Sequence, residues 1–243
     1  MNINKSFTFP FEDKAWLSKL GIGALVSLVP ILNFAWSGYM VELIRNVTNN
    51  TAEPLPNWDN FGKKFTEGLI LVLVGLVYAL PIIILICLPL SVMTVPAILA
   101  GDGGLGDFGQ VVAGVGGVLF FCMMLLLVAY SLILSVVFPA ILVVFAREGT
   151  FASCFKFREV FDIIGRNAGP FFTAWGVSLG AGIAIGFVTG IVQTILGLIP
   201  CIGWIAALVI SMGLIVYTSS VYAHLFGQFG NIAFGQNQQV IES

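Results

Sequence analysis

The chain is 243 residues long, with 58% hydrophobic and 9% charged residues and a formal net charge of −2. A soluble domain carries roughly 25% charged residues, so this composition excludes a water-facing globular fold, and the few Lys and Arg residues exclude the dense basic patch that nucleic-acid binding needs. With a mean hydropathy of +1.03, the chain is predicted to be an all-α, polytopic integral membrane protein, folded as a single membrane domain over residues 1–243.

The first apolar block covers residues 15–47 and is the shortest of three. A turn is predicted at residues 29–34, where Pro30 and Asn33 interrupt the apolar run. The two arms are about 14 residues each, or about 21 Å at the helical rise, against a hydrocarbon core of about 30 Å. The block is therefore predicted to be a helical hairpin that crosses twice, with a re-entrant pair or one kinked crossing as alternatives.

The second and third blocks, residues 68–146 and 168–227, are each long enough for two crossing helices. The second contains a Gly-rich run at residues 101–109, and the third contains Pro200 and Gly203, and both patterns are turn signals. We therefore predict three hairpins, and so about six transmembrane or re-entrant segments, followed by a polar C-terminal tail at residues 228–243.

The ten Lys and Arg residues fall into three zones, namely the N-terminal region, the first loop (residues 48–67) with its flank, and the second loop (residues 147–167). They are Lys5, Lys14 and Lys19, then Arg45, Lys63 and Lys64, then Arg147, Lys156, Arg158 and Arg166. With three hairpins, all of these zones share one membrane face. Because cytoplasmic loops are enriched in Lys and Arg, we expect a multi-pass protein of the cell membrane with both termini in the cytoplasm.

Both loops carry an amphipathic pattern. In the first loop, Trp58, Phe61 and Phe65 recur at helical spacing. In the second loop, the apolar positions form a longer stripe, made of Phe151, Cys154, Phe157, Phe161 and Ile164. Each loop is therefore predicted to contain a short helix that lies in the cytoplasmic headgroup region.

The residues around the first loop also follow a known order. They form a Gly-Tyr-x5-Arg stretch, a Leu-Pro-x-Trp-x2-Phe stretch and a Phe-x2-Gly-Leu stretch, made here by Gly38, Tyr39, Arg45, Leu55, Pro56, Trp58, Phe61, Phe65, Gly68 and Leu69. This order resembles the prokaryotic membrane-protein family called domain of unknown function 4013. The resemblance covers residues 38–69 and implies no particular activity, cofactor or partner.

Six of these residues form a candidate interfacial or binding motif, namely Tyr39, Arg45, Pro56, Trp58, Phe61 and Gly68. Trp58 and Tyr39 suit the bilayer interface, because each has an apolar body and one polar edge. Asn57 can cap the short helix expected after it. We favour a structural role for the motif at the membrane surface, with a binding role as the alternative.

The third block contains a stripe of small residues, Gly176, Gly180, Gly182, Gly186 and Gly190. In lipid, such stripes allow helix backbones to approach closely and to gain packing contacts. The stripe is therefore a candidate helix-packing surface. Packing within the chain is the favoured interpretation, and a seam with a partner or a second copy is the alternative.

Residues that could carry chemistry are sparse. His224 is the only histidine and the four cysteines are far apart, whereas a metal site needs three or four ligands. We recognise no nucleophile with a neighbouring base and no paired carboxylates. The sequence therefore predicts no catalytic, metal-binding or cofactor-binding residues, which favours a protein that is not an enzyme.

Three function hypotheses follow. The leading one is a non-enzymatic membrane scaffold, accessory subunit or lipid-interacting protein, whose partners are membrane lipids and a protein or second copy bound through the Gly-rich helix. The alternative is a transporter or channel for a small neutral or hydrophobic substrate, which requires a cavity lined by Gln193, Thr194 or the serines. An enzyme acting on lipid would need a polar cluster made by Glu42, Arg45, Asp59, Glu67 and Asp162.

Overall fold

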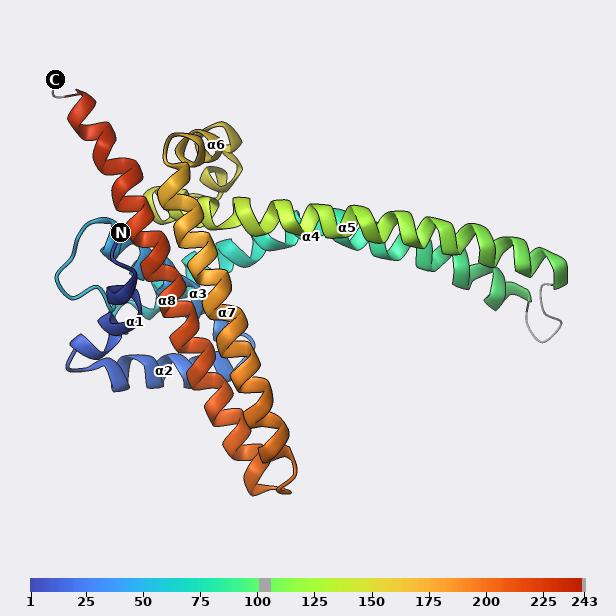
Figure 1. Cartoon of the computed structure of the whole chain (residues 1–243), viewed down its shortest axis with the longest axis horizontal. Coiled ribbons are helices and arrows are strands. Elements are labelled where there is room, and N and C mark those ends of the chain that lie inside the picture. Colours follow the sequence, from blue (N-terminus) through green and yellow to red (C-terminus); the bar gives the residue numbers. More distant parts are fainter. Residues whose placement is uncertain (101–105, 242–243) are drawn as a thin grey trace. The chain divides into compact units, whose positions relative to one another are not determined.

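The computed structural model describes residues 1–100 and 106–241, and within those residues every regular element is a helix (Figure 1). In chain order they are α1 (Ile3–Glu12), α2 (Trp16–Leu28), α3 (Asn33–Thr48), α4 (Phe61–Ala100), α5 (Gly106–Glu148), the 3-10 helix η2 (Phe151–Phe155), α6 (Phe157–Arg166), α7 (Ala168–Gly197) and α8 (Ile202–Ile241). The predicted all-α membrane fold is confirmed. The chain forms two compact units, Leu73–Val137 and the remainder, Met1–Val72 with Phe138–Ser243.

Four helices, α4, α5, α7 and α8, are long and apolar enough to cross a membrane. The arms of the predicted first hairpin are α2 and α3, with 13 and 16 residues, and both are shorter than a typical span of about 20 residues. The turn between them falls within the predicted residues 29–34, because α2 ends at Leu28 and α3 begins at Asn33. Two crossings in this block remain a prediction.

The first loop differs from the sequence prediction. Residues 57–60 are not helical, and no separate short helix covers residues 57–65, because Phe61 begins α4. The turn before α4 ends at Asn60, which has a φ of 54° and accepts the first backbone hydrogen bonds of α4 from Lys63 and Lys64. Extending an existing helix costs less than nucleating a separate one, so the amphipathic residues after Asn60 join the long helix.

The second loop is helical over most of the predicted range, as η2 and α6. Its predicted apolar stripe is divided between two environments. Cys154 and Ile164 are buried, whereas the rings of Phe157 and Phe161 are 46% and 56% exposed. The buried face of α6 also includes Val160 and Ile163, so its inward face is rotated from the predicted stripe.

The unit Leu73–Val137 contains the C-terminal part of α4 and the N-terminal part of α5, which run side by side (Figure 1). The Tyr130 hydroxyl donates a hydrogen bond to the Tyr78 carbonyl oxygen at 2.9 Å and joins the two helices. α4 continues through three internal prolines, which membrane helices tolerate. Residues 101–105 of the predicted Gly-rich turn lie outside the described residues.

The third block forms the helix pair α7 and α8, which pack side by side (Figure 1). The turn is in the predicted place, but its left-handed residue is Cys201, with a φ of 63°. Gly203 is needed for a different reason, since a Cβ there would overlap the carbonyl oxygen of Leu196. The polar tail predicted at residues 228–243 is helical as far as Ile241, because α8 continues past the end of the apolar run.

Candidate functional site

An aromatic stack lies between α3 and the first loop. Tyr39 is fully buried and packs against two indole rings, with ring centroids 5.0 Å from Trp36 and 4.9 Å from Trp58. Phe61 extends the group, 6.4 Å from Trp58. Trp58 Nε1 donates a hydrogen bond of 2.8 Å to the carbonyl oxygen of Lys19. The stack therefore joins α2, α3 and the beginning of α4 through the side chain of one loop residue.

Two glycines bring the backbones of α3 and α4 into direct contact. A Cβ at Gly38 would overlap the carbonyl oxygen of Lys64, and a Cβ at Gly68 would overlap the carbonyl oxygen of Phe34. No other residue fits at either position without moving a backbone. Close helix approach at small residues is a common packing device in membranes. Here it brings the charged first turns of α4 against α3.

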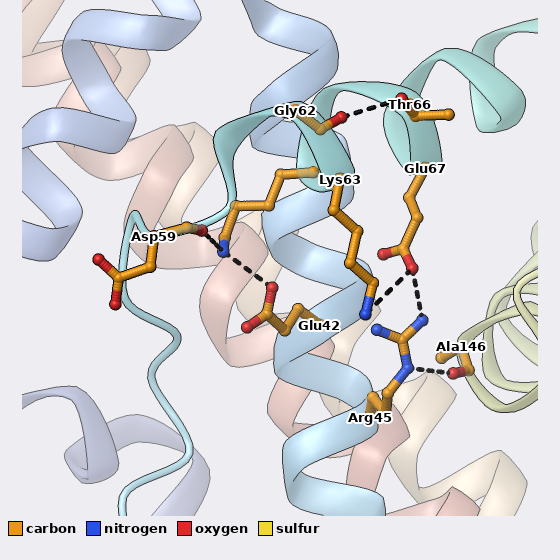
Figure 2. A network of polar contacts seen from close by, with 9 residues as sticks. Glu42, Arg45, Asp59, Gly62, Lys63, Thr66, Glu67 and Ala146 are labelled. Carbon is orange, nitrogen blue, oxygen red and sulfur yellow. Dashed lines mark hydrogen bonds and ion pairs between the residues drawn. The ribbon is translucent and has the colours of Figure 1, made fainter.

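Five charged side chains gather at this crossing and are called the charge node, namely Glu42, Arg45, Lys63, Lys64 and Glu67 (Figure 2). Arg45 Nη2 donates to Glu67 Oε1 at 2.9 Å, and Arg45 Nε donates to the Ala146 carbonyl oxygen at 2.7 Å. Lys64 Nζ lies 2.8 Å from Glu42 Oε2. Because Ala146 belongs to α5, Arg45 connects three helices.

The charge node ranges from buried to exposed, since the Lys63 side chain is 60% exposed and those of Arg45 and Glu42 are 22% and 27% exposed. The side chains of Lys64 and Glu67 are 2% and 10% exposed, respectively. Tyr39 Oη, Arg45 Nη1 and Glu67 Oε2 are buried without a hydrogen-bond partner in the described part of the chain. Both carboxylates are held by a cation within 3 Å. A carboxylate held in this way is suited to joining helices, because its negative charge is already matched.

The six motif residues predicted from the sequence all lie in this region, namely Tyr39, Arg45, Pro56, Trp58, Phe61 and Gly68. Pro56 is buried in the loop. The cluster required for a lipid-acting enzyme forms only in part. Asp59 contributes its backbone carbonyl oxygen to Lys64 at 2.8 Å, and Asp162 lies on α6 in an exposed pair with Arg166.

The five glycines predicted to pack a helix are all on α7, and an added Cβ at any of them would have no heavy atom within 4 Å. They are Gly176, Gly180, Gly182, Gly186 and Gly190. Against the described residues of this chain, these glycines therefore make no close packing contact of the kind expected. A seam with another helix remains a prediction.

The sequence interpretation missed a polar cluster that joins α1 to α8. His224 is 3% exposed, its Nδ1 is 3.0 Å from Ser6 Oγ, and its ring stacks on Phe9 at a centroid distance of 4.2 Å. Gln228 Nε2 donates to Ser6 Oγ at 2.9 Å. The residue that could have indicated α1 from the sequence was Asn2, whose side chain caps this helix. The first residues thus form a docked helix, which the sequence interpretation did not predict.

A second missed contact is the ion pair between Lys19 Nζ and Asp13 Oδ2, 2.6 Å apart and nearly buried. Burial acts to raise the pKa of Asp13, but hydrogen bonds from Lys19 and the Ala15 amide and the positive charge of Lys19 outweigh it, so that pKa lies below its usual value. Lys19 also donates to the Leu55 carbonyl oxygen at 3.0 Å. This lysine therefore holds the start of α2 against the first loop.

In residues 1–100 and 106–241, no three His, Cys, Asp or Glu side chains are arranged to hold a metal ion. Burial raises the pKa of the Cys154 thiol to about 11, although the neighbouring Ser153 hydroxyl lowers it in part. A thiol of that pKa is protonated at neutral pH and is a poor nucleophile.

A family model described as "Protein of unknown function (DUF4013)" matches residues 22–194. No curated protein and no solved structure matches the chain. The matched range confirms the resemblance predicted from the motif and extends well beyond residues 38–69. It contains the whole charge node and most of α7.

Proposed function

We propose a scaffold function for this chain, which belongs to the DUF4013 family. In this proposal the chain is a non-enzymatic membrane protein that receives a transmembrane helix of a protein partner on its α7–α8 pair. The observation that carries the proposal is an open groove along that pair. The groove has a volume of about 530 Å³ and is lined by Gly182, Gly186 and Gly190 on α7 and by Ser211, Thr218 and Ser219 on α8.

The groove is suited to another helix because its small residues leave room for a second backbone. The most apolar 18-residue stretch of α7 has no buried residue, and the three groove glycines have open space where a Cβ would be. Without a hydrophobic gain, helices in lipid associate through close packing at such small residues. A helix docked here would fill the open space beside the three groove glycines, which no described residue of this chain fills.

The hydroxyl groups in the groove are already bonded within their own helices. Thr189, Thr218 and Ser219 each donate to a backbone carbonyl one turn earlier, and Gln193 Nε2 donates to Ser211 Oγ at 2.6 Å. These groups do not need hydrogen bonds from a docked helix, because their own donors are already bonded. An apolar helix packed here would therefore leave these serine and threonine hydroxyl groups bonded.

The charge node is compatible with a scaffold, because it fixes α3, α4 and α5 relative to one another. Arg45 joins α3 to α4 and α5 through hydrogen bonds, and Gly38 and Gly68 allow the backbones of α3 and α4 to lie in direct contact. On the positive-inside rule, we place this node at the cytoplasmic face of the cell membrane.

Site-specific photo-crosslinking in native membranes tests the proposal. A benzophenone side chain is placed at Ile215, which lines the groove, or at Leu179, which is 48% exposed but outside it. The expected result is a protein adduct at Ile215 that falls to the Leu179 level when Gly186→Leu fills the groove. Gly176→Leu, outside the groove, is the matched control and should leave the adduct intact. Adducts with lipid alone at both positions would refute a protein-docking groove.

A transporter for a small neutral or hydrophobic substrate is the second candidate, because Gln193 and three serines line the groove. It predicts that proteoliposomes take up glycerol or urea faster than empty vesicles, and that Gln193→Leu slows the uptake. Thr194, also predicted to line such a cavity, instead bonds to the Gly190 carbonyl oxygen and is not among the lining residues. Equal uptake by empty and protein-containing vesicles would remove this candidate.

A further inference from the structure

Two polar cavities adjoin each other beside the last turns of α8. The first has a volume of about 490 Å³ and the second about 570 Å³, which is within the range of small-ligand sites, roughly 300–1,000 Å³. Asn50 and Asn231 line both cavities. The two spaces therefore share a wall made of side-chain amides. Asn231 Nδ2 donates one hydrogen to the Thr48 carbonyl oxygen at 2.7 Å, and its second hydrogen can be donated to an anion.

The charged residues that line these cavities are all cations. Arg45 and Arg147 line the first cavity, and Lys5 lines the second. No Asp or Glu is among the described residues that line either one. This is unusual for a chain with more acidic than basic residues, 12 against 10. A polar cavity with cations and amides but no carboxylate is complementary to an anion.

The two arginines are held in place before any ligand binds. Arg147 lies over the ring of Phe234, with its guanidinium carbon 4.5 Å from the ring centroid. Its ion pair with Glu159 is loose, at 3.6 Å. Arg45 is fixed by the Ala146 carbonyl oxygen at 2.7 Å and by Glu67 Oε1 at 2.9 Å. Because Glu67 already matches the charge of Arg45, Arg147 is the arginine available to a ligand. Pre-organised guanidinium groups bind phosphate well, because their planar donors match its oxygens and little side-chain freedom is lost on binding.

The first cavity lies where the apolar spans end. The apolar runs of the second and third blocks end at residues 146 and 227, and the cavity is lined by residues beyond these ends, Arg147, Phe234 and Gly235. On the topology predicted from the sequence, this end of the helices lies at the cytoplasmic headgroup level, where the phosphate groups of phospholipids are. Basic pockets between helices at this level are suited to anionic headgroups.

We infer that these adjoining cavities form a binding site for a phosphate group, contacted by Arg147 and by the amides of Asn50 and Asn231, with Lys5 at the far end. The phosphate can come from an anionic phospholipid headgroup or from a soluble phosphate ester. This inference is independent of the proposed helix groove, because the two sites share no lining residue.

A charge introduced at Asn50 tests the site with little risk to folding. Asn50 is exposed and has a φ of 54°, a conformation that Asp tolerates, and Asn60 is exposed with the same φ but lines neither cavity. Asn50→Asp and Asn60→Asp therefore change the net charge equally, but only the first puts a carboxylate in the shared wall. Arg147→Gln and Arg158→Gln form a second matched pair, because Arg158 is exposed and lines neither cavity.

The measurement is native mass spectrometry of the full chain in detergent, titrated with phosphatidylglycerol, phosphatidylcholine or sn-glycerol 3-phosphate. We expect phosphatidylglycerol to bind tightest, and Asn50→Asp and Arg147→Gln each to weaken it about fivefold to tenfold, with both controls within about twofold of wild type. If glycerol phosphate binds as tightly and shows the same dependence on Asn50, the ligand is a soluble phosphate. Equal binding of the anionic and zwitterionic lipids, together with no binding of glycerol phosphate, would overturn the inference. So would equal effects of Asn50→Asp and Asn60→Asp.

Discussion

Removal of one partner of the Arg45–Glu67 ion pair tests whether the charge node holds its helices together. Arg45 Nη2 and Glu67 Oε1 are 2.9 Å apart, and the side chains are 22% and 10% exposed. The pair between Arg166 and Asp162 has the same separation of 2.9 Å, but its side chains are 67% and 49% exposed. The two pairs therefore match in distance and differ in burial.

Loss of one partner of a buried ion pair costs about 3–5 kcal/mol, because the other charge stays away from water, whereas an exposed pair contributes about 0–1 kcal/mol. We expect Glu67→Met to lower the free energy of unfolding by about 3 kcal/mol, the lower limit, because Arg45 keeps its bond to the Ala146 carbonyl oxygen. The double variant with Arg45→Met should recover most of that loss, since no unmatched charge remains. Arg166→Met should change the free energy by less than about 1 kcal/mol.

The assay is unfolding in mixed micelles with an increasing mole fraction of SDS, followed by the fluorescence of the buried indole rings. The free-energy losses of the two single variants should not add up in the double variant. If Glu67→Met costs no more than Arg166→Met, the charge node is not a buried electrostatic contact. If the double variant loses the sum of the two single losses, the two side chains act independently and the pair does not exist in the membrane protein.

Three further substitutions follow from the same region, all measured by the same unfolding assay. Gly38→Ala should cost about 3 kcal/mol or more, since its Cβ would overlap a backbone oxygen, whereas Gly62→Ala, with open space around it, should raise stability by up to about 1 kcal/mol. Tyr39→Phe should be neutral or stabilising by about 1 kcal/mol, because the buried hydroxyl has no partner among the described residues; a loss of stability would reveal a hidden partner. The lowered pKa of Asp13 means that its contribution is present above the usual carboxyl pKa and is lost as the pH falls through the lowered value. Asp13→Asn should therefore reduce the acid sensitivity of the wild type, and an unchanged pH profile would show that the pair with Lys19 is not formed.

The fold class could be predicted from the composition of the whole chain, and the six-residue motif from one short stretch of sequence, whereas the ion pairs of the charge node were not predicted. The charge balance excludes a soluble fold, and Arg45, Trp58 and Gly68 lie within one short stretch whose order resembles a known family. The first loop was harder, since the pattern at residues 57–65 fits a separate helix as well as the first turn of a longer one. Only the turn at Asn60 decides between them. His224 could not be placed, because its partners Ser6 and Phe9 are more than 200 residues away.

The glycines of α7 show that, in a membrane protein, a sequence pattern can predict a packing surface without predicting what packs on it. In water, an apolar surface must be covered, so a hydrophobic pattern predicts burial inside the same chain. In lipid, the chain gains little by covering an apolar surface. A small-residue stripe there predicts close contact but does not identify the segment that makes the contact. The stripe at Gly182, Gly186 and Gly190 forms one wall of an open groove, with α8 as the other wall. The spacing of these glycines is compatible with either a partner helix or lipid in the groove. The distinction depends on whether Gly186→Leu displaces a protein from Ile215, because lipid chains can rearrange around a leucine and a docked helix cannot.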